Sequence, residues 1–194
     1  MDLVFATHNL NKLEEVKLLL PKYINLLSLA DIGCTEDIPE TEKTLEGNAL
    51  LKANYVLSNY GHNCFADDTG LLVNALNGEP GVYSARYAGP DGKAEDNIKK
   101  LLSALKNTQQ RTAYFKTVIA LQLPDKSHLF TAKVEGDITS EALGTGGFGY
   151  DAVFKPKGVD QTFAELPIAV KNSISHRGKA LKKLLKFLNK NVSP

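Results

Sequence analysis

Two adjacent aspartates at the end of an apolar run are the strongest sign of chemistry in this sequence. Asp67 and Asp68 follow Phe65-Ala66 and precede Thr69-Gly70. Carboxylates beside a buried segment cost free energy unless they are paired, so their presence indicates a function. Successive side chains of a strand point to opposite faces, so one aspartate can face a metal ion or water while the other supports it. The alternative is a plain turn, because Asp-Asp before Thr-Gly is common where a strand ends.

A second polar segment, residues 7–12, lies where a short strand is expected to turn into a helix. The first amide groups of a helix have no partner within it and attract anions, so Thr7, His8 and Asn9 are candidates for binding a phosphate. Asn9 is equally well explained as the residue that caps the helix. Residues 31–44 form an acidic connection that contains Glu40, and acidic loops of this kind are usually only solvated.

A third segment is rich in glycine. Gly144, Gly146 and Gly149 match the spacing of the dinucleotide-binding fingerprint, but that fingerprint needs a helix directly after it. Residues 150–154 are instead predicted to form a strand, so we do not expect a Rossmann site. The aromatic residue Phe148 favours close approach of the backbone to a flat ligand with the ring stacked on it. The alternative is a tight connection between strands.

Phosphate binding would need separate cations, because the sequence contains no P-loop motif. Any single basic residue could be an ordinary surface group, but the surrounding motifs favour Lys12, Lys52, Arg86 and Lys171. His176 and Arg177 stand at the predicted start of the last helix, where a cation is mildly unfavourable. An anionic ligand would explain this placement, and so would pairing of Arg177 with a nearby acid.

The elements that position these segments follow from the apolar periodicity. Strands are expected at residues 3–6, 24–29, 64–66 and 150–154, helices at 12–20, 45–60, 98–105 and in the last stretch of the chain, and a hairpin at 112–123 and 129–134. Pro21 and Gly61 are predicted to end the first two helices. This order indicates an α/β protein with a mixed β-sheet and flanking helices, with the polar segments gathered where strand ends meet helix starts.

Size and composition restrict the classes of function. A chain of 194 residues suits one domain, which we expect over residues 1–194. The formal net charge of +1 gives no overall field that favours nucleic acid or an anionic membrane, so neither is expected as a partner. Cys34 and Cys64 are far apart, which argues against a zinc site or a disulfide framework. Without a basic leader or an apolar run of membrane-spanning length, the protein is expected in the cytoplasm.

Together and in order, these segments resemble the inosine triphosphate pyrophosphatase (ITPase) family, enzymes that hydrolyse non-canonical purine nucleoside triphosphates to the monophosphate and pyrophosphate. The resemblance covers nearly the whole chain. It rests on THNLNK at residues 7–12, ADDTGL at 66–71, PGVYSARY at 80–87, the glycine-rich residues 144–151 and SHRG at 175–178, with Glu40, Asn48, Lys52 and Lys171. His8 and Asn11 stand where bacterial members usually carry glycine, and Thr69 replaces a usual serine. An ITPase-like fold with an active-site cleft between two lobes is therefore implied.

The resemblance also implies catalytic roles. Asp68 would be the general base and a Mg²⁺ ligand, Glu40 a second carboxylate near the metal, and Asp67 a support. This fits a magnesium ion, which prefers oxygen ligands, takes few protein carboxylates and binds substrate phosphates. Hydrogen bonds and positive charge around an attacking water would stabilise the reaction. The implied substrate-binding residues on this side are Thr7, His8, Asn9, Lys12, Lys52, Thr69 and Arg86.

The base of the nucleotide is assigned to a second group of residues by the same resemblance, namely Phe148, Gly149, Tyr150, Asp151, Lys171, His176 and Arg177. Donors aimed at a 6-oxo group would accept inosine or xanthine and would clash with the amine of adenine. The family also implies a homodimer, to whose interface residues 83–89 could contribute. Two alternatives stay open at this point: a related nucleotide pyrophosphatase with a different base preference, and a nucleic-acid-binding module that uses the basic face of the last helix.

Overall fold

The computed structural model of the protein describes residues 1–191. The chain forms two compact units. The first unit contains residues 1–68, 117–132 and the described residues from 177 onward, and the second contains residues 69–116 and 133–176. Each unit is therefore assembled from separate stretches of the chain. Three strands of the protein contribute residues to both units.

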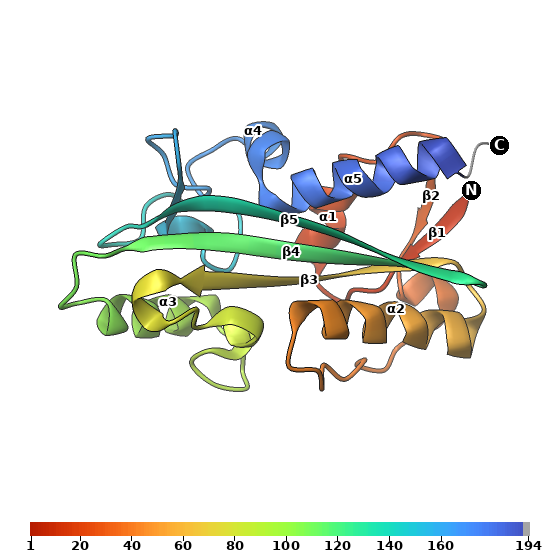
Figure 1. The fold of residues 1–194 in the computed structure, drawn as a ribbon, viewed down its shortest axis with the longest axis horizontal. Helices are drawn as coiled ribbons and strands as arrows, with labels where there is room; N and C mark the ends of the chain where they lie inside the picture. Colours follow the sequence, from red (N-terminus) through yellow and green to blue (C-terminus); the bar gives the residue numbers. More distant parts are fainter. Residues whose placement is uncertain (192–194) are drawn as a thin grey trace. The chain divides into compact units, whose positions relative to one another are not determined.

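The strands form a mixed sheet in the order β2-β1-β3-β4-β5-β6. β1 pairs in parallel with both β2 and β3, and β5 pairs with β6 antiparallel. The prediction of an α/β protein with a mixed sheet and flanking helices is confirmed (Figure 1). The strands are β1 (Asp2–Phe5), β2 (Asn25–Leu27), β3 (Cys64–Val73), β4 (Thr112–Leu123), β5 (Lys126–Ile138) and β6 (Phe154–Pro156), and the helices are α1 (Leu10–Lys17), α2 (Leu45–Tyr60), α3 (Ala94–Ala104), α4 (Ile168–Ile174) and α5 (His176–Asn191).

Local sequence signals explain where the first two helices begin and end. The Asn9 side chain accepts a hydrogen bond from the Lys12 amide at 3.2 Å, so the capping interpretation of Asn9 is confirmed. Thr44 caps α2 in the same way through the amide of Gly47. Gly61 follows α2 with a φ of 71°, a left-handed conformation that glycine adopts without strain, and ends the helix as predicted. α1 ends at Lys17, before Pro21.

Two strand predictions were wrong. β3 does not stop at the aspartates but continues through them to Val73, because both carboxylates have buried partners and the chain needs no turn there. Residues 150–154 do not form one strand. Asp151–Val153 form a 3-10 helix and β6 begins only at Phe154, because the Asp151 carboxylate bends back to accept the Phe148 amide at 2.8 Å.

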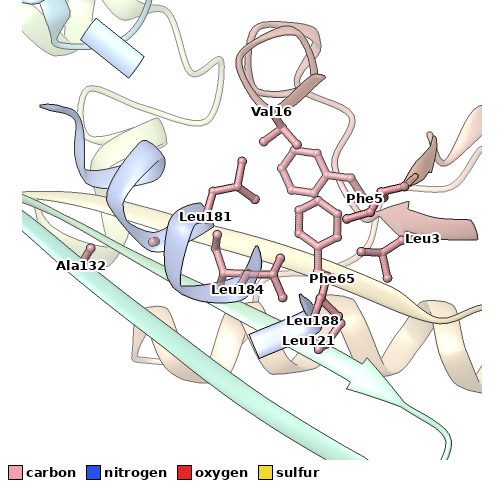
Figure 2. Packing of buried hydrophobic residues seen from close by; sticks show 12 residues of the cluster. Leu3, Phe5, Val16, Phe65, Leu121, Ala132, Leu181, Leu184 and Leu188 are labelled. Carbon is pink, nitrogen blue, oxygen red and sulfur yellow. The ribbon is translucent and has the colours of Figure 1, made fainter. Parts of the chain in front are cut away.

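The core of the first unit lies between β1, β3 and β4 on one side and α1 and α5 on the other (Figure 2). Phe5 and Phe65 come from neighbouring strands, and their rings stack at a centroid distance of 4.6 Å. Leu181 and Leu184 of α5 pack against this cluster, while the lysines of α5 face outward, as its periodicity predicts. The strand that carries the aspartates is thus fixed from one face by a close-packed apolar layer.

The core of the second unit is more aromatic. Phe115 of β4 packs edge-on against Phe154 at 4.7 Å and lies 6.2 Å from Phe163. The His176 ring stacks on Phe115 at 4.5 Å and is buried.

Within residues 1–191, no helix combines the length and apolar character needed to cross a membrane.

We expect Phe65→Ala to lower the free energy of unfolding by about 3 to 5 kcal/mol, because it removes a fully buried ring and leaves a cavity beside Phe5. Denaturant titration followed by far-UV circular dichroism measures this change. Leu18→Ala is the matched control, since that side chain is 62% exposed, and it should change the value by less than about 0.5 kcal/mol. Equal losses in the two variants would contradict this account of the core.

Candidate active site

The two aspartates of β3 have separate sets of partners, as the alternation of a strand requires. Asp67 is buried, and its carboxylate accepts from Lys12 Nζ at 2.8 Å and from Arg177 Nε at 2.9 Å. Arg177 also donates to Glu15 at 2.5 Å. Helices α1 and α5 therefore supply the charges that allow Asp67 to be buried.

Asp68 lies in a more acidic environment. Its Oδ2 accepts from the side-chain amide of Asn48 at 3.2 Å, and its Oδ1 lies 3.9 Å from Lys52 Nζ. Lys52 lies much closer to Glu40, at 2.6 Å. One lysine of α2 thus stands between two carboxylates that come from different parts of the chain.

The pKa values of the two aspartates are shifted in opposite directions. Burial raises the pKa of Asp68 to about 6; Lys52 opposes this rise, whereas the Glu40 carboxylate adds to it. Burial would also raise the pKa of Asp67, but Lys12 and Arg177 outweigh it and hold that pKa well below the usual range. Asp67 therefore stays ionised near neutral pH, whereas Asp68 takes up a proton when the pH falls to about 6.

The group around Lys52 fits a magnesium ion. Glu40 and Asp68 offer carboxylate oxygens, the donors that Mg²⁺ prefers, and two protein carboxylates leave the remaining positions to water and phosphate. Burial and the repulsion from Glu40 disfavour the charge on Asp68, and a cation would relieve both. No cluster of three or more histidines, cysteines or acids able to hold a metal exists within residues 1–191.

The loop before α1 belongs to the same unit. The Thr7 hydroxyl accepts from the Asn9 amide at 3.1 Å, and His8 Nε2 lies 3.0 Å from the backbone oxygen of Glu36. His8 and Asn9 are exposed. The first unit therefore contains most residues predicted for the metal and the phosphates, namely Thr7, His8, Asn9, Lys12, Glu40, Lys52 and Asp68.

The second unit contains a buried ion pair beside aromatic rings. Lys171 Nζ lies 2.5 Å from Asp151 Oδ2 and 4.8 Å from the centre of the Phe148 ring. Gly147 allows this arrangement, because a Cβ at that position would lie 2.2 Å from Asp151 Oδ2. The buried Tyr150 hydroxyl donates to the Ser84 carbonyl at 2.9 Å. Five residues predicted for the base thus gather here, namely Phe148, Gly149, Tyr150, Asp151 and Lys171.

The other predicted residues have different surroundings. Thr69 and Arg86 lie in the second unit, and Arg86 stands 5.3 Å from the centre of the Tyr83 ring. Arg86 also lines an open groove of about 560 Å³ formed by residues 77–83, 86, 87 and 100. His176 packs in the aromatic core of the second unit. Arg177 belongs to the first unit, where it pairs with acids, which is the alternative that the sequence left open.

Sequence reasoning missed the buried residue Glu15, and it named Asn48 only as part of the family resemblance, without a role. Glu15 accepts from Arg177, and Asn48 bridges Asp68 and the backbone amide of Glu42. Glu15 follows Lys12 by three residues, so both lie on one face of α1, and this spacing was the available signal. Asn48 lies one turn before Lys52 on α2, which likewise places the two on one face.

The mixed sheet and the buried acid–lysine clusters define the class, an α/β protein with a charged polar site in each unit. A family model described as the Ham1 family matches residues 3–187, and the chain belongs to that family. The resemblance to the ITPase family that the sequence indicates is thereby confirmed.

Similar proteins cover the whole length of the chain. A protein of Flavobacterium johnsoniae named dITP/XTP pyrophosphatase is 58% identical over 188 residues, which are 97% of this chain and 98% of that protein. A protein of the same name from Christiangramia forsetii is 56% identical over 98% of this chain and all of its own length. The structure of the Staphylococcus aureus Ham1 protein matches with a TM-score of 0.89 and 39% identity, covering 98% of this chain and 99% of that one.

Two glycine variants separate the contact at Gly147 from its backbone conformation. Gly147 and Gly149 have similar φ values of 68° and 62°, but an added Cβ meets Asp151 at the first and nothing within 4 Å at the second. We expect Gly149→Ala to cost about 1 kcal/mol of unfolding free energy and Gly147→Ala about 2 to 4 kcal/mol, because it also separates Asp151 from Phe148 and Lys171. Thermal unfolding of both variants measures the difference. Similar losses would refute the contact.

The raised pKa of Asp68 predicts a stability effect with a definite sign. A carboxyl whose pKa is about 6 in the folded protein and 3.8 in the unfolded chain stabilises the fold below pH 4 and loses that contribution as the pH rises through 6. The side chain of the Asp68→Asn variant does not titrate, so it makes no pH-dependent contribution of this kind. From pH 4 to pH 8, the variant should therefore gain about 2 to 3 kcal/mol of unfolding free energy relative to the unmodified protein. Denaturant titrations in EDTA measure this, and a difference that does not change with pH would contradict it.

Proposed function

We propose that the chain hydrolyses non-canonical purine nucleoside triphosphates (ITP, dITP and XTP) to the nucleoside monophosphate and pyrophosphate, in a magnesium-dependent reaction. The chain belongs to the Ham1 family, and its relatives carry the name dITP/XTP pyrophosphatase. The observation that carries the proposal is the group of Asp68, Glu40 and Lys52, in which the buried Asp68 carboxyl has a pKa of about 6 and the buried Lys52 also pairs with the partly exposed Glu40.

Asp68 is the general base in this proposal. A group with a pKa close to the working pH combines a sizeable ionised fraction with enough basicity to take a proton from water. The water oxygen bonds to phosphorus, its proton passes to the Asp68 carboxylate, and the bond between the α- and β-phosphates breaks with pyrophosphate leaving. Mg²⁺, held by Glu40 and Asp68, would neutralise phosphate charge and lower the pKa of bound water.

The neighbouring cations and polar groups bind the phosphates. Lys52 already lies between the carboxylates of Glu40 and Asp68. Lys12 of α1 is held by Asp67, the residue before Asp68 in β3, and belongs to the same unit. Ion pairs with fixed acids keep these lysines in place before substrate arrives, which reduces the reorganisation that binding requires. Thr7, His8, Asn9, Thr69 and Arg86 are the further phosphate-side residues in this proposal.

The second unit provides the base-binding residues. Lys171 offers N–H donors to a 6-oxo group, and Asp151 holds the ammonium group in place at 2.5 Å. Phe148 supplies a flat ring next to this pair. Adenine would present its amine to the same donor, so a buried group would be left unpaired and binding would weaken. Gly149, Tyr150 and His176 complete the proposed set in this unit, and Arg177, which pairs with Asp67 and Glu15 in the first unit, is the remaining residue of the proposal.

Assembly and location are part of the same proposal. We infer a homodimer in which residues 83–89 contribute to the interface, and a cytoplasmic location where nucleotide pools are maintained. The support for the interface is local: Tyr83 is 55% exposed and borders the groove of the second unit, and large exposed aromatic residues are enriched at interfaces.

The proposal predicts pyrophosphate from ITP and XTP, little from ATP and GTP, and none without Mg²⁺. The test incubates the protein with each triphosphate and quantifies pyrophosphate and orthophosphate separately. Asp68→Asn should lower kcat by at least about 100-fold, the lower range for loss of a general base, while the far-UV spectrum stays unchanged. Pyrophosphate from all four substrates would overturn the base assignment alone. A folded and fully active Asp68→Asn would overturn the mechanism.

A further inference from the structure

The irregular segment at residues 34–44, here called the strap, lies along helix α2 in the opposite direction (Figure 1). As the strap residue number rises, the number of its partner on α2 falls. Glu36 bonds to Tyr55 and Tyr60, Glu40 to Lys52, Glu42 to Asn48, and Thr44 to Gly47. Ordered contacts of this kind hold a chain segment in one register, although it has no regular secondary structure.

The early end of the strap is held by one carboxylate. Glu36 Oε1 accepts from the Tyr60 hydroxyl at 2.6 Å and from the Tyr55 hydroxyl at 2.7 Å, and Oε2 accepts from the Thr35 amide at 3.1 Å. The two tyrosine hydroxyls lower the pKa of Glu36 to about 2. The group is therefore ionised at any pH at which the protein would work, and its hydrogen bonds have the added strength of a charged acceptor.

Two residues of the proposed site depend on the position of the strap. Glu40, four residues after Glu36, reaches Lys52 from the strap. His8 Nε2 lies 3.0 Å from the backbone oxygen of Glu36. A carbonyl oxygen only accepts, so Nε2 carries the proton and donates it. The strap thus connects the proposed metal carboxylate with the loop before α1.

We propose that Glu36, held by Tyr55 and Tyr60, is a positioning residue that fixes the strap on α2 and thereby places Glu40 for the metal and His8 for the phosphates. This inference rests on the proposed function, because the value of a fixed Glu40 lies in binding Mg²⁺. Glu36 touches no reacting group and acts only through the strap. Without it, the strap keeps its later contacts at Asn48 and Gly47, while the part that carries Glu40 gains freedom.

Removing only the two hydroxyls gives the sharpest test. Tyr55→Phe/Tyr60→Phe keeps both rings and deletes the donors to Glu36. Glu36→Ala deletes the acceptor, and Glu36→Gln keeps one neutral oxygen for the hydroxyls. Asp31→Ala is the matched control: Asp31 is also an exposed carboxylate of the first unit that accepts from an amide and a hydroxyl, both of Ser28, but it is connected to neither Glu40 nor His8.

Three measurements test the inference. Hydrogen exchange of the metal-free protein should become faster at residues 34–44 in Tyr55→Phe/Tyr60→Phe and Glu36→Ala, with α2 unchanged. Binding of Mn²⁺ alone, followed by electron paramagnetic resonance, should weaken about tenfold, the scale of one charged hydrogen bond. KM for Mg²⁺-ITP should rise more than kcat falls. Glu36→Gln should recover part of each effect, and Asp31→Ala should show none.

The outcomes separate this inference from the proposed function. Unchanged exchange in the double variant would overturn the role of Glu36, and so would faster exchange with unchanged Mn²⁺ binding, because the strap would then not position Glu40. An unmodified protein that binds no Mn²⁺ and hydrolyses no nucleotide would overturn the proposed function instead. In that case exchange at residues 34–44 would still decide whether Glu36 fixes the strap.

Discussion

The structure of the first unit depends on one constraint, that two adjacent carboxylates lie inside a buried strand. Asp67 and Asp68 are only 1% and 6% exposed, and neither could be buried as an anion without partners. Alternation of side chains in β3 separates them, so each needs its own partners from other elements. The rest of the first unit can be understood as the means of supplying those partners.

The elements around β3 supply them unequally. Asp67 receives two cations, Lys12 from α1 and Arg177 from α5, and its pKa falls. Asp68 receives an amide from Asn48 and a lysine that is shared with Glu40; burial raises its pKa to about 6, because Lys52 only partly opposes the effect of burial and Glu40 adds to it. Identical residues therefore become a permanent anion and a proton acceptor through position alone, which is the separation of roles that acid–base chemistry needs. Because buried ion pairs rarely stabilise a fold more than apolar residues would, their presence points to function.

Much of the architecture could be predicted from the sequence, because its signals are local. Periodicity located α2 and β4 with the correct bounds, and Asn9 and Gly61 marked helix ends through well-defined chemistry. The errors came where long-range contacts decide the local structure. Nothing near Asp67 in the sequence shows that Arg177 will neutralise it 110 residues later, so the end of β3 was misplaced. The bend at Asp151 is an exception, because it follows from a local contact in which the carboxylate accepts from the Phe148 amide.

The same limit applies to the candidate sites. The residue types and their motifs were visible in the sequence, but the pairing was not: which acid holds which lysine follows from packing between distant segments. Sequence reasoning treated the acidic residues 31–44 as a solvated loop carrying Glu40, whereas the structure lays the strap along α2 through successive hydrogen bonds. Its register follows from hydroxyls and amides that have no periodic pattern.

The two units share one arrangement of charged side chains. In each, a lysine is held by a carboxylate at 2.5 to 2.8 Å within a largely buried setting, as in Lys12 with Asp67 and Lys171 with Asp151. A lysine held in this way keeps its direction but still has N–H groups to donate. Such a group can recognise an oxygen without first ordering a flexible side chain, so much of the entropic cost of binding is met during folding. Selectivity then depends on which oxygen a ligand can present, and a ligand that presents a donor instead leaves the buried ammonium group poorly paired.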